Sequence, residues 1–322
     1  MKAGNPRALP QLDGGLFLTD GGIETTLIFN EGIGLPHFAA FHLLKDKAGE
    51  AALRRYFRAY GALAKRFGAG LILESATWRA SADWGAKLGY DGRDLLEANR
   101  RAIWLLEELR DEMKGTRVVI SGCVGPRGDG YVADAVMTPR EAQIYHARQV
   151  DAFASTAADM VTAITMTTTE EAVGIAHAAR EAGLPVAISF TVETDGRLPS
   201  GEPLGAAIER SDHETSGYVA YYMINCAHPT HFAGALEAKF ASRIRGLRAN
   251  ASQKSHAELN ESTELDAGNP AELGAQYASL KQRLLPELAV LGGCCGTDHR
   301  HVEQMALACQ PLFQNGSGFT AK

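Results

Sequence analysis

Eight short apolar runs, separated by stretches with helical periodicity, constrain the fold of this chain more than any other feature. The runs span residues 16–20, 71–75, 118–122, 159–165, 185–190, 221–225, 246–250 and 288–293. They consist almost throughout of apolar or small residues, which is typical of strands buried on both faces of a parallel sheet. The sequence therefore predicts eight buried strands.

The stretches between these runs carry apolar residues at three- and four-residue spacing, which indicates amphipathic helices. One such stripe lies within residues 53–67, and another lies within 103–113. Thr138 followed by Pro139 is typical of a helix start, with the threonine as N-cap and the proline at the first helical position. Further helices are expected over residues 170–182 and 271–285.

Strands that alternate with helices predict an α/β fold, specifically a (β/α)8 TIM barrel. A doubly wound open sheet is the structural alternative, but no GxGxxG motif follows the first run and no Walker A motif occurs. A length of 322 residues fits one barrel. Residues 1–322 are therefore expected to form a single domain, with its core over about 14–310 and a frayed tail over 313–322.

Composition narrows the possible partners. Lys and Arg number 32 against 38 Asp and Glu, a net charge of −6, and the basic residues form no block, which argues against nucleic acid or an anionic membrane. No apolar run reaches the roughly 18 residues of a membrane helix, and no signal-peptide core is visible. Five cysteines are too few for a disulfide scaffold. We expect a cytoplasmic, reducing location and small-molecule partners, and the oligomeric state stays open.

Three of the five cysteines follow predicted strands at the end of a barrel where active sites lie. Cys226 follows the sixth run, and Cys294 and Cys295 follow the eighth between glycines. Three thiolates that converge there favour zinc, and a site with three protein ligands leaves a fourth tetrahedral position for substrate. Cys123 and Cys309 are interpreted as small buried hydrophobes.

Four histidines lie close to these cysteines in sequence and are weaker candidates for ligands. They are His228, His231, His299 and His301. Imidazoles on loops are more often surface groups or groups that support a ligand, so we expect none of the four to be needed for the metal.

Four motifs carry a resemblance to a known family. They are LGGCCGTDHRH at 291–301, INCAHP at 224–229, TDGG at 19–22 and GCVGPRGDGY at 122–131. Through them the chain resembles the homocysteine S-methyltransferases, zinc-dependent homocysteine-binding barrels that include betaine-homocysteine and S-methylmethionine-homocysteine enzymes. The resemblance extends from about Asp20 to His301, which is most of the chain.

The resemblance implies roles for individual residues. It makes Cys226, Cys294 and Cys295 the zinc ligands, and it places Asp20, Gly21 and Ser75 where the family contacts the amino-acid part of homocysteine. Asp20 would orient the substrate ammonium, and backbone N–H groups near Gly21 and Ser75 would hold its carboxylate. We also expect Asn225 to support its neighbour Cys226.

One position departs from the pattern of the family. Many members carry a glutamate at the end of the fourth strand that helps hold the substrate ammonium, and Ile164 stands at that position here. An apolar side chain cannot pair with an ammonium ion, so one substrate contact is missing. Glu193 after the fifth run, or Glu24 after the first, is our hypothesis for its replacement.

The resemblance implies an enzyme of methionine biosynthesis that methylates the zinc-bound thiolate of homocysteine. The donor would be S-methylmethionine, S-adenosylmethionine or betaine, with Trp78 as an aromatic face for its positive charge. The chain is too short to add cobalamin and folate modules, although a separate corrinoid protein stays possible as donor. Two alternatives remain: a zinc barrel methyltransferase or lyase acting on another thiol, and a non-catalytic barrel that binds zinc or a thiol.

Overall fold

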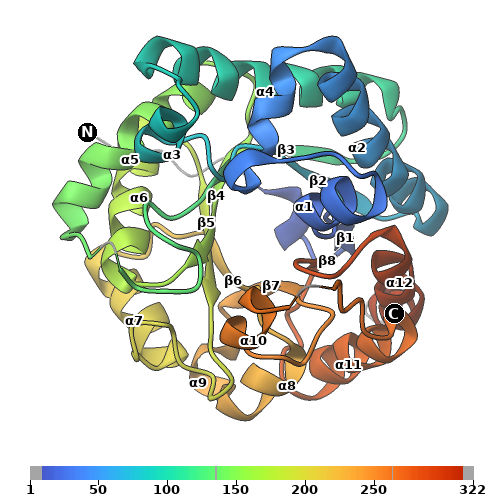
Figure 1. The fold of residues 1–322 in the computed structure, drawn as a ribbon. Coiled ribbons are helices and arrows are strands. Elements are labelled where there is room, and N and C mark those ends of the chain that lie inside the picture. The colour runs from blue at the N-terminus through green and yellow to red at the C-terminus, as the bar shows by residue number, and fades with distance from the viewer. Residues whose placement is uncertain (1–8, 135, 263, 315–322) are drawn as a thin grey trace, which may run out of the picture.

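The fold is a closed barrel of parallel strands surrounded by helices, seen along the barrel axis in Figure 1. The computed structural model describes residues 9–134, 136–262 and 264–314. Within those ranges eight strands pair in sequence order, and β8 closes the barrel by pairing in parallel with β1. The predicted (β/α)8 architecture is confirmed.

Each strand overlaps one of the predicted apolar runs. The strands are β1 (Phe17–Leu18), β2 (Gly70–Glu74), β3 (Val118–Val124), β4 (Met160–Met166), β5 (Val186–Thr191), β6 (Tyr221–Asn225), β7 (Ile244–Ala249) and β8 (Val290–Gly293). Strands β1 and β8 are shorter than predicted. The regular pairing of β1 ends at Leu18, and Asp20 lies two residues beyond the strand, although the Thr19 N–H still donates to Leu291 O and Asp20 O accepts the N–H of Gly293.

Long helices follow most of the strands and cover the outside of the barrel. They are α2 (Lys47–Phe67), α4 (Gly92–Glu112), α5 (Pro139–Ala154), α6 (Thr169–Ala182), α7 (Leu204–Glu214), α11 (Pro270–Arg283) and α12 (His299–Gln314). Short helices occupy the loops: α1 (Ile23–Thr25), α3 (Ala82–Lys87), α8 (Pro229–Phe232), α9 (Ala238–Ala241) and α10 (His256–Asn260).

The predicted start of α5 is confirmed in detail. The hydroxyl of Thr138 accepts the backbone N–H of Glu141, and the Glu141 carboxylate accepts the N–H of Thr138, which is a complete capping box. Pro139 occupies the first helical position, where its missing N–H leaves no hydrogen bond unmade.

The barrel interior changes character along its axis. Its lower part is filled by an apolar cluster to which seven strands contribute: Phe17, Ile72, Val119, Met160, Ala187, Tyr221, Met223 and Val290, together with Leu9. Towards the C-terminal ends of the strands the buried side chains become polar: Glu74, Ser121, Thr162, Ser189, Asn225 and Arg248. The apolar filling stabilises the barrel, and the polar layer is the floor of the site described below.

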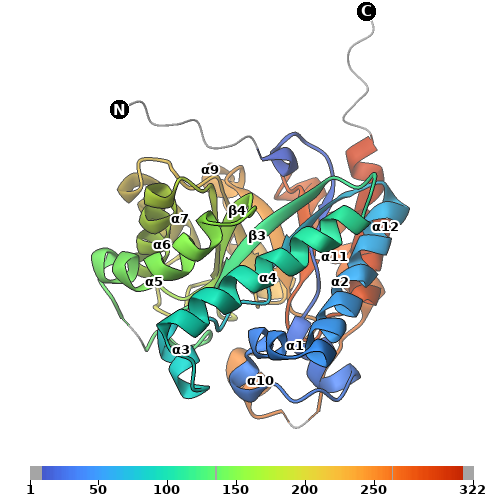
Figure 2. The same ribbon diagram turned by 90° about the horizontal axis from the view of Figure 1, so that it is seen from above.

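The short helices α1, α3 and α10 gather at one end of the barrel, as Figure 2 shows. They belong to loops that follow strands, so this is the end at which barrel active sites lie. Among the described residues no helix combines the length and apolarity required to cross a bilayer. The predicted tail, 313–322, lies outside the described residues except for its first two positions, which belong to α12.

Candidate active site

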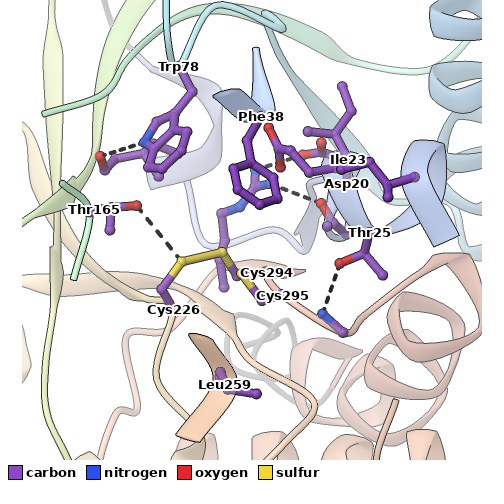
Figure 3. A pocket seen from close by; sticks show the side chains of 18 of the residues that line it. Asp20, Ile23, Thr25, Phe38, Trp78, Thr165, Cys226, Leu259, Cys294 and Cys295 are labelled. Atoms are coloured by element: carbon purple, nitrogen blue, oxygen red, sulfur yellow. Dashed lines mark hydrogen bonds and ion pairs between the residues drawn. A yellow bond between two sulfur atoms is a disulfide. The ribbon is translucent and has the colours of Figure 1, made fainter. Parts of the chain in front are cut away.

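The three predicted cysteines meet at the mouth of the barrel. Cys226 directly follows β6, and Cys294 and Cys295 directly follow β8. Their sulfur atoms all lie within 4.8 Å of one another. The structure joins Cys226 to Cys294 as a disulfide and leaves Cys295 as a thiol, as Figure 3 shows. The convergence inferred from the strand ends is therefore present.

The backbone of Cys226 is held in an unusual conformation by two side chains. Its φ is 53°, in the left-handed region that non-glycine residues rarely adopt. The carbonyl oxygen of Cys226 accepts a hydrogen bond from Asn250 Nδ2 at 3.0 Å and another from His256 Nε2 at 2.6 Å. Such strain persists only where the surroundings over-determine it, so these two residues fix the direction of the Cys226 side chain.

A second left-handed residue, Thr165, lies beside Cys226 and is clamped by Asn225. Thr165 has a φ of 66°, and its hydroxyl is 3.8 Å from Cys226 Sγ. The Asn225 amide accepts the backbone N–H of Thr165 at 3.0 Å and donates to its hydroxyl at 2.8 Å. Ser189 donates to the same amide oxygen at 2.6 Å. Asn225 thus supports the cysteine site through Thr165 as well as through the chain.

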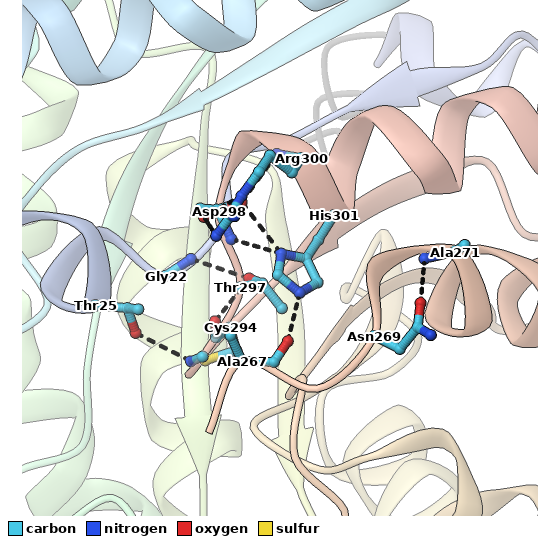
Figure 4. Close-up of polar contacts among 11 residues, drawn as sticks. Gly22, Thr25, Ala267, Asn269, Ala271, Cys294, Thr297, Asp298, Arg300 and His301 are labelled. Carbon is cyan, nitrogen blue, oxygen red and sulfur yellow. Dashed lines mark hydrogen bonds and ion pairs between the residues drawn. The ribbon is translucent and has the colours of Figure 1, made fainter. Parts of the chain in front are cut away.

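The loop after β8 is tied to its neighbours by a polar network (Figure 4). Cys294 O accepts from both the hydroxyl and the N–H of Thr297, and the backbone N–H of Gly22 donates to Thr297. Further along, His301 interacts with Asp298 and hydrogen-bonds to the Ala267 carbonyl at 2.8 Å. Thr297 therefore holds the turn that bears Cys294 and Cys295, and the DHRH segment after it fixes the start of α12.

Glycine is required where the first loop approaches this turn. A Cβ at Gly22 would lie 2.6 Å from Cys294 O, and a Cβ at Gly21 would lie 2.8 Å from the Tyr60 hydroxyl. Real Cβ atoms essentially never come that close to another heavy atom. The two glycines thus allow the loop that bears Asp20 to lie against the cysteine turn.

Cys123, Cys309, His228 and His301 lie in structural positions, and His231 hydrogen-bonds to the Gln253 carbonyl through Nε2. Cys123 and Cys309 are buried, as expected for small hydrophobes. His228 accepts the N–H of Thr230 at the start of α8, and burial lowers its pKa to about 4. His301 is fully buried in the network described above.

The donor set of the three cysteines fits a soft metal ion such as zinc. Burial raises the pKa of the Cys295 thiol, so a thiolate at this position needs a compensating positive charge. Three converging sulfurs make a site that an added soft cation would complete.

A cavity of about 360 Å³ opens above the cysteines. Residues that line it come from strand β4 and from the loops after β1, β2, β3 and β7: Asp20, Gly21, Glu24, Ser75, Ala76, Trp78, Arg79, Asp129, Tyr131, Ile164, Thr165, Ser252, Leu259 and Asp266 among others. The apolar side chains of Phe29 and Phe38 stand at its rim and are more than half exposed. Its volume is that of a small-molecule site.

Asp20 faces this cavity and forms a buried ion pair. Its Oδ1 lies 2.7 Å from Arg248 Nη1, and its Oδ2 accepts the Tyr56 hydroxyl at 2.8 Å. Arg248 comes from β7 and points into the polar layer of the barrel, where Glu74 also lies. Burial raises the pKa of Glu74 to about 7, although the charge of Arg248 opposes that rise.

Gly21 and Ser75, the predicted contacts for the substrate carboxylate, differ in their placement. Gly21 lines the cavity. Ser75 also lines it, but its N–H donates to Ser121 O, and its hydroxyl accepts the N–H of Cys123 at 2.9 Å. The next N–H, that of Ala76, has no hydrogen-bond partner among the described residues and is the donor that this turn can offer.

Glu24 and Glu193, the two candidates to replace the missing ammonium contact, lie in different surroundings. Glu24 lines the cavity, and burial, assisted by the charge of Asp20, raises its pKa to about 7. Glu193 is not among the residues that line the cavity, and its Oε1 lies 3.0 Å from His256 Nδ1. Through His256 it supports the Cys226 carbonyl instead, so the expectation of a substrate contact at Glu193 has no support in its placement. Ile164 lines the cavity and leaves an apolar wall there.

Trp78 and Tyr131 also line the cavity, and Trp78 is not the open aromatic face that the sequence suggests. The Arg79 guanidinium lies 3.9 Å from the centre of the Trp78 ring, so a cation of the protein itself already covers that aromatic face. The Tyr131 hydroxyl is 3.0 Å from Cys295 Sγ, and the Tyr131 ring stacks on His256 at 4.2 Å.

Sequence reasoning missed several residues of the site: Arg79, Tyr131, Arg248, Asn250 and His256. One signal was available for Arg248, because an arginine within an otherwise buried strand needs a buried anionic partner. Tyr131 lies inside the motif at 122–131, whose spacing alone does not indicate a contact with Cys295.

Comparison with known proteins gives the family. The family described as homocysteine S-methyltransferase matches residues 17–309. No curated protein sequence matches significantly. Among solved structures, the homocysteine methyltransferase MmuM of Escherichia coli is similar in its oxidised form (TM-score 0.73, 20% identity, 94% of this chain and 98% of that chain). Its metallated form is also similar (TM-score 0.71, 18% identity, the same coverage).

Proposed function

This chain belongs to the homocysteine S-methyltransferase family, and on that premise we propose that it moves a methyl group from a sulfonium or quaternary ammonium donor to homocysteine. The new bond joins the methyl carbon to the homocysteine thiolate sulfur. The bond from that carbon to the positively charged sulfur or nitrogen breaks, and its electron pair stays with the leaving group. The products are methionine and a neutral thioether or amine.

Cys226, Cys294 and Cys295 would hold a zinc ion in this proposal. When bound, zinc supplies a Lewis acid that favours the deprotonated form of a substrate thiol near neutral pH. The chain orients its sulfurs through the contacts described above: Asn250 and His256 on the Cys226 carbonyl, and the Tyr131 hydroxyl at 3.0 Å from Cys295 Sγ.

Residues of the first two loops would position the substrate. We assign the substrate ammonium to the carboxylates of Asp20 and Glu24, both of which line the cavity. The substrate carboxylate would accept from the backbone at Gly21 and from the turn at Ser75 and Ala76, where the Ala76 N–H has no partner among the described residues. The apolar rim formed by Phe29 and Phe38 would limit the access of water to the reacting sulfur.

One observation carries the proposal: three cysteine sulfurs within 4.8 Å of one another face a cavity of about 360 Å³ at the C-terminal end of the barrel strands. Structural zinc sites are closed by four protein ligands, whereas catalytic sites leave a position open for substrate. Three cysteines beside such a cavity match the catalytic pattern.

The test is a zinc count per chain on reduced protein, followed by methionine formation from homocysteine and S-methylmethionine in the same sample. We expect one zinc per chain, lost in a Cys294→Ser variant, and methionine formation that depends on it. A Cys309→Ser variant is the matched control, because Cys309 is buried away from the site. Reduced, zinc-replenished protein that holds no zinc would contradict the metal assignment.

The apolar wall at Ile164 favours one alternative substrate, a thiol that lacks the amino group. Comparison of homocysteine with 4-mercaptobutyrate, which keeps the carboxylate and loses the ammonium, separates the two. A higher kcat/KM for 4-mercaptobutyrate would replace homocysteine with a simpler thiol acid. A Glu24→Gln variant that loses its preference for homocysteine would support the assignment of the ammonium to Glu24.

A further inference from the structure

Arg79 is a buried cation on the cavity wall without an acidic partner at ion-pair distance among the described residues. Its side chain follows β2, lines the cavity and is 5% exposed. No carboxylate of the described residues lies within 4.0 Å of its guanidinium, and its Nε is buried without a hydrogen-bond partner there. Arg248, which is buried to a similar degree, is by contrast paired with Asp20.

The guanidinium of Arg79 is fixed in place from both sides. Its central carbon lies 3.9 Å from the centre of the Trp78 ring and 3.7 Å from that of Trp84. Its Nη1 donates to the Gly128 carbonyl at 2.9 Å. A guanidinium held between two aromatic rings offers its N–H groups only at its edge, so its orientation is set before any ligand arrives.

Burial lowers the pKa of Arg79 to about 10, which leaves the side chain charged at neutral pH. The negative charges of Asp129 and Glu24 partly oppose this lowering of the pKa, although neither carboxylate lies within 4.0 Å of the Arg79 guanidinium, and Glu24 lines the same cavity. A buried charge without a close partner is costly, and a ligand carboxylate would offset that cost through charge-assisted hydrogen bonds.

We propose that Arg79 determines donor specificity by binding a carboxylate of the methyl donor. The donor is then a zwitterion whose carboxylate lies at Arg79 and whose onium centre lies in the cavity that Arg79 lines. The inference rests on the proposed function and names the carboxylate as the part of the donor that the chain recognises. It also explains why the face of Trp78 is covered, because Arg79 makes this wall a site for an anion.

Arg79 shares the loop after β2 with the turn at Ser75 and Ala76, but its guanidinium lies on a different side of the cavity from Asp20 and Gly21, and we assign the carboxylate it binds to the donor. Arg79 packs against Trp78 and Gly128, on the side of the cavity formed by the loops after β2 and β3. Asp20 and Gly21 lie with Cys294 on the side formed by the loops after β1 and β8.

The experiment compares two sulfonium probes by calorimetric titration of the reduced, zinc-loaded full chain. Dimethylsulfonioacetate carries a carboxylate, and trimethylsulfonium does not. In Arg79→Met we expect dimethylsulfonioacetate to bind about 10- to 100-fold more weakly, the loss of one charge-assisted contact, and trimethylsulfonium to bind as in the wild type. Arg79→Lys keeps the positive charge but loses the planar set of N–H donors. Its affinity for dimethylsulfonioacetate should therefore lie between those of the wild type and Arg79→Met.

Lys87→Met is the matched control, because the Lys87 ammonium also lies over Trp84, at 3.8 Å, but does not line the cavity. It should leave the affinity for both probes unchanged. Unchanged trimethylsulfonium affinity in Arg79→Met shows that the altered pocket is still folded. Equal loss for both probes, no loss for either, or no binding of dimethylsulfonioacetate to the wild type would overturn the proposal.

A second measurement tests whether Arg79 binds the methyl donor or the thiol substrate. If Arg79→Met raises KM for homocysteine but not for 3-aminopropanethiol, which lacks the carboxylate, Arg79 binds the thiol and the donor assignment is wrong. Methylation of homocysteine by trimethylsulfonium at high concentration separates the two levels of inference. If it persists while the Arg79 predictions fail, the proposed function stands and the specificity role does not.

Discussion

The ion pair between Arg248 and Asp20 gives a quantitative test of the polar layer in the barrel. Arg248→Met removes the cation but keeps most of the side-chain volume. Arg248 and Asp20 are 8% and 6% exposed, so the change leaves the Asp20 carboxylate in the interior with the Tyr56 hydroxyl at 2.8 Å as its remaining polar contact. Breaking a buried pair from one side costs roughly 3–5 kcal/mol of unfolding free energy.

The same strand provides a control. Arg245 on β7 pairs with Glu287 at 2.5 Å, but these side chains are 25% and 51% exposed. Exposed pairs contribute about 0–1 kcal/mol, so Arg245→Met should change stability little. At roughly 2 °C per kcal/mol for a chain of this size, the midpoint of thermal unfolding should fall by about 6–10 °C for Arg248→Met and by about 2 °C or less for Arg245→Met.

Thermal and urea unfolding of both variants measure this difference. Arg248→Met combined with Asp20→Asn should recover part of the loss, because the amide removes the unpaired charge. If Arg248→Met is no less stable than Arg245→Met, or if Asp20→Asn adds its full cost to Arg248→Met, the pair does not compensate the buried carboxylate and the reasoning fails.

Three further predictions concern the same end of the barrel. Burial raises the pKa of Glu74 to about 7 in the folded state, so the free energy of unfolding of the wild type should fall as pH rises from 4.5 to 8. Glu74→Gln, which cannot ionise, should match the wild type near pH 4.5 and be more stable at pH 8 by up to about 3 kcal/mol. Urea titrations in which both proteins show the same pH profile would contradict this. Asn225→Ala should weaken zinc binding by about 10- to 100-fold in a chelator competition while the circular dichroism spectrum is kept, since Thr165 loses its clamp; unchanged zinc affinity would remove Asn225 from the support of the site. Gly22→Ala should displace the cysteine turn and lower the zinc content, whereas Gly34→Ala, where a Cβ meets nothing within 4 Å, should not; equal zinc content in both would refute the requirement for glycine.

The predictable part of this molecule follows from local patterns and from the geometry of parallel sheets. Buried strands are recognisable from their apolar composition, and a capping box such as that of Thr138 lies within four residues of sequence. Cys226 and Cys294 could be brought together from sequence because the C-terminal ends of all strands in a parallel barrel share one rim.

The side-chain directions in the loops could not be derived in this way. Glu193 follows β5 and was expected to face the cavity, but its N–H donates to Arg197 O in a turn, and its carboxylate reaches His256 instead. The partners of Arg248 and Tyr131 come from distant segments, and no local periodicity encodes such contacts. The positive φ of Cys226 is likewise a product of tertiary contacts, because cysteine has no intrinsic preference for it.

The barrel divides its tasks between two arcs of the same rim. The metal-binding cysteines proposed above follow β6 and β8, whereas Trp78, Arg79 and Tyr131 belong to the loops after β2 and β3. Replacing the segments around Arg79 and Tyr131 would exchange the donor while the three cysteines and the loop after β1 are kept. Such a scaffold can diversify by loop grafting, and the contact of Tyr131 with Cys295 marks the junction that a graft must preserve.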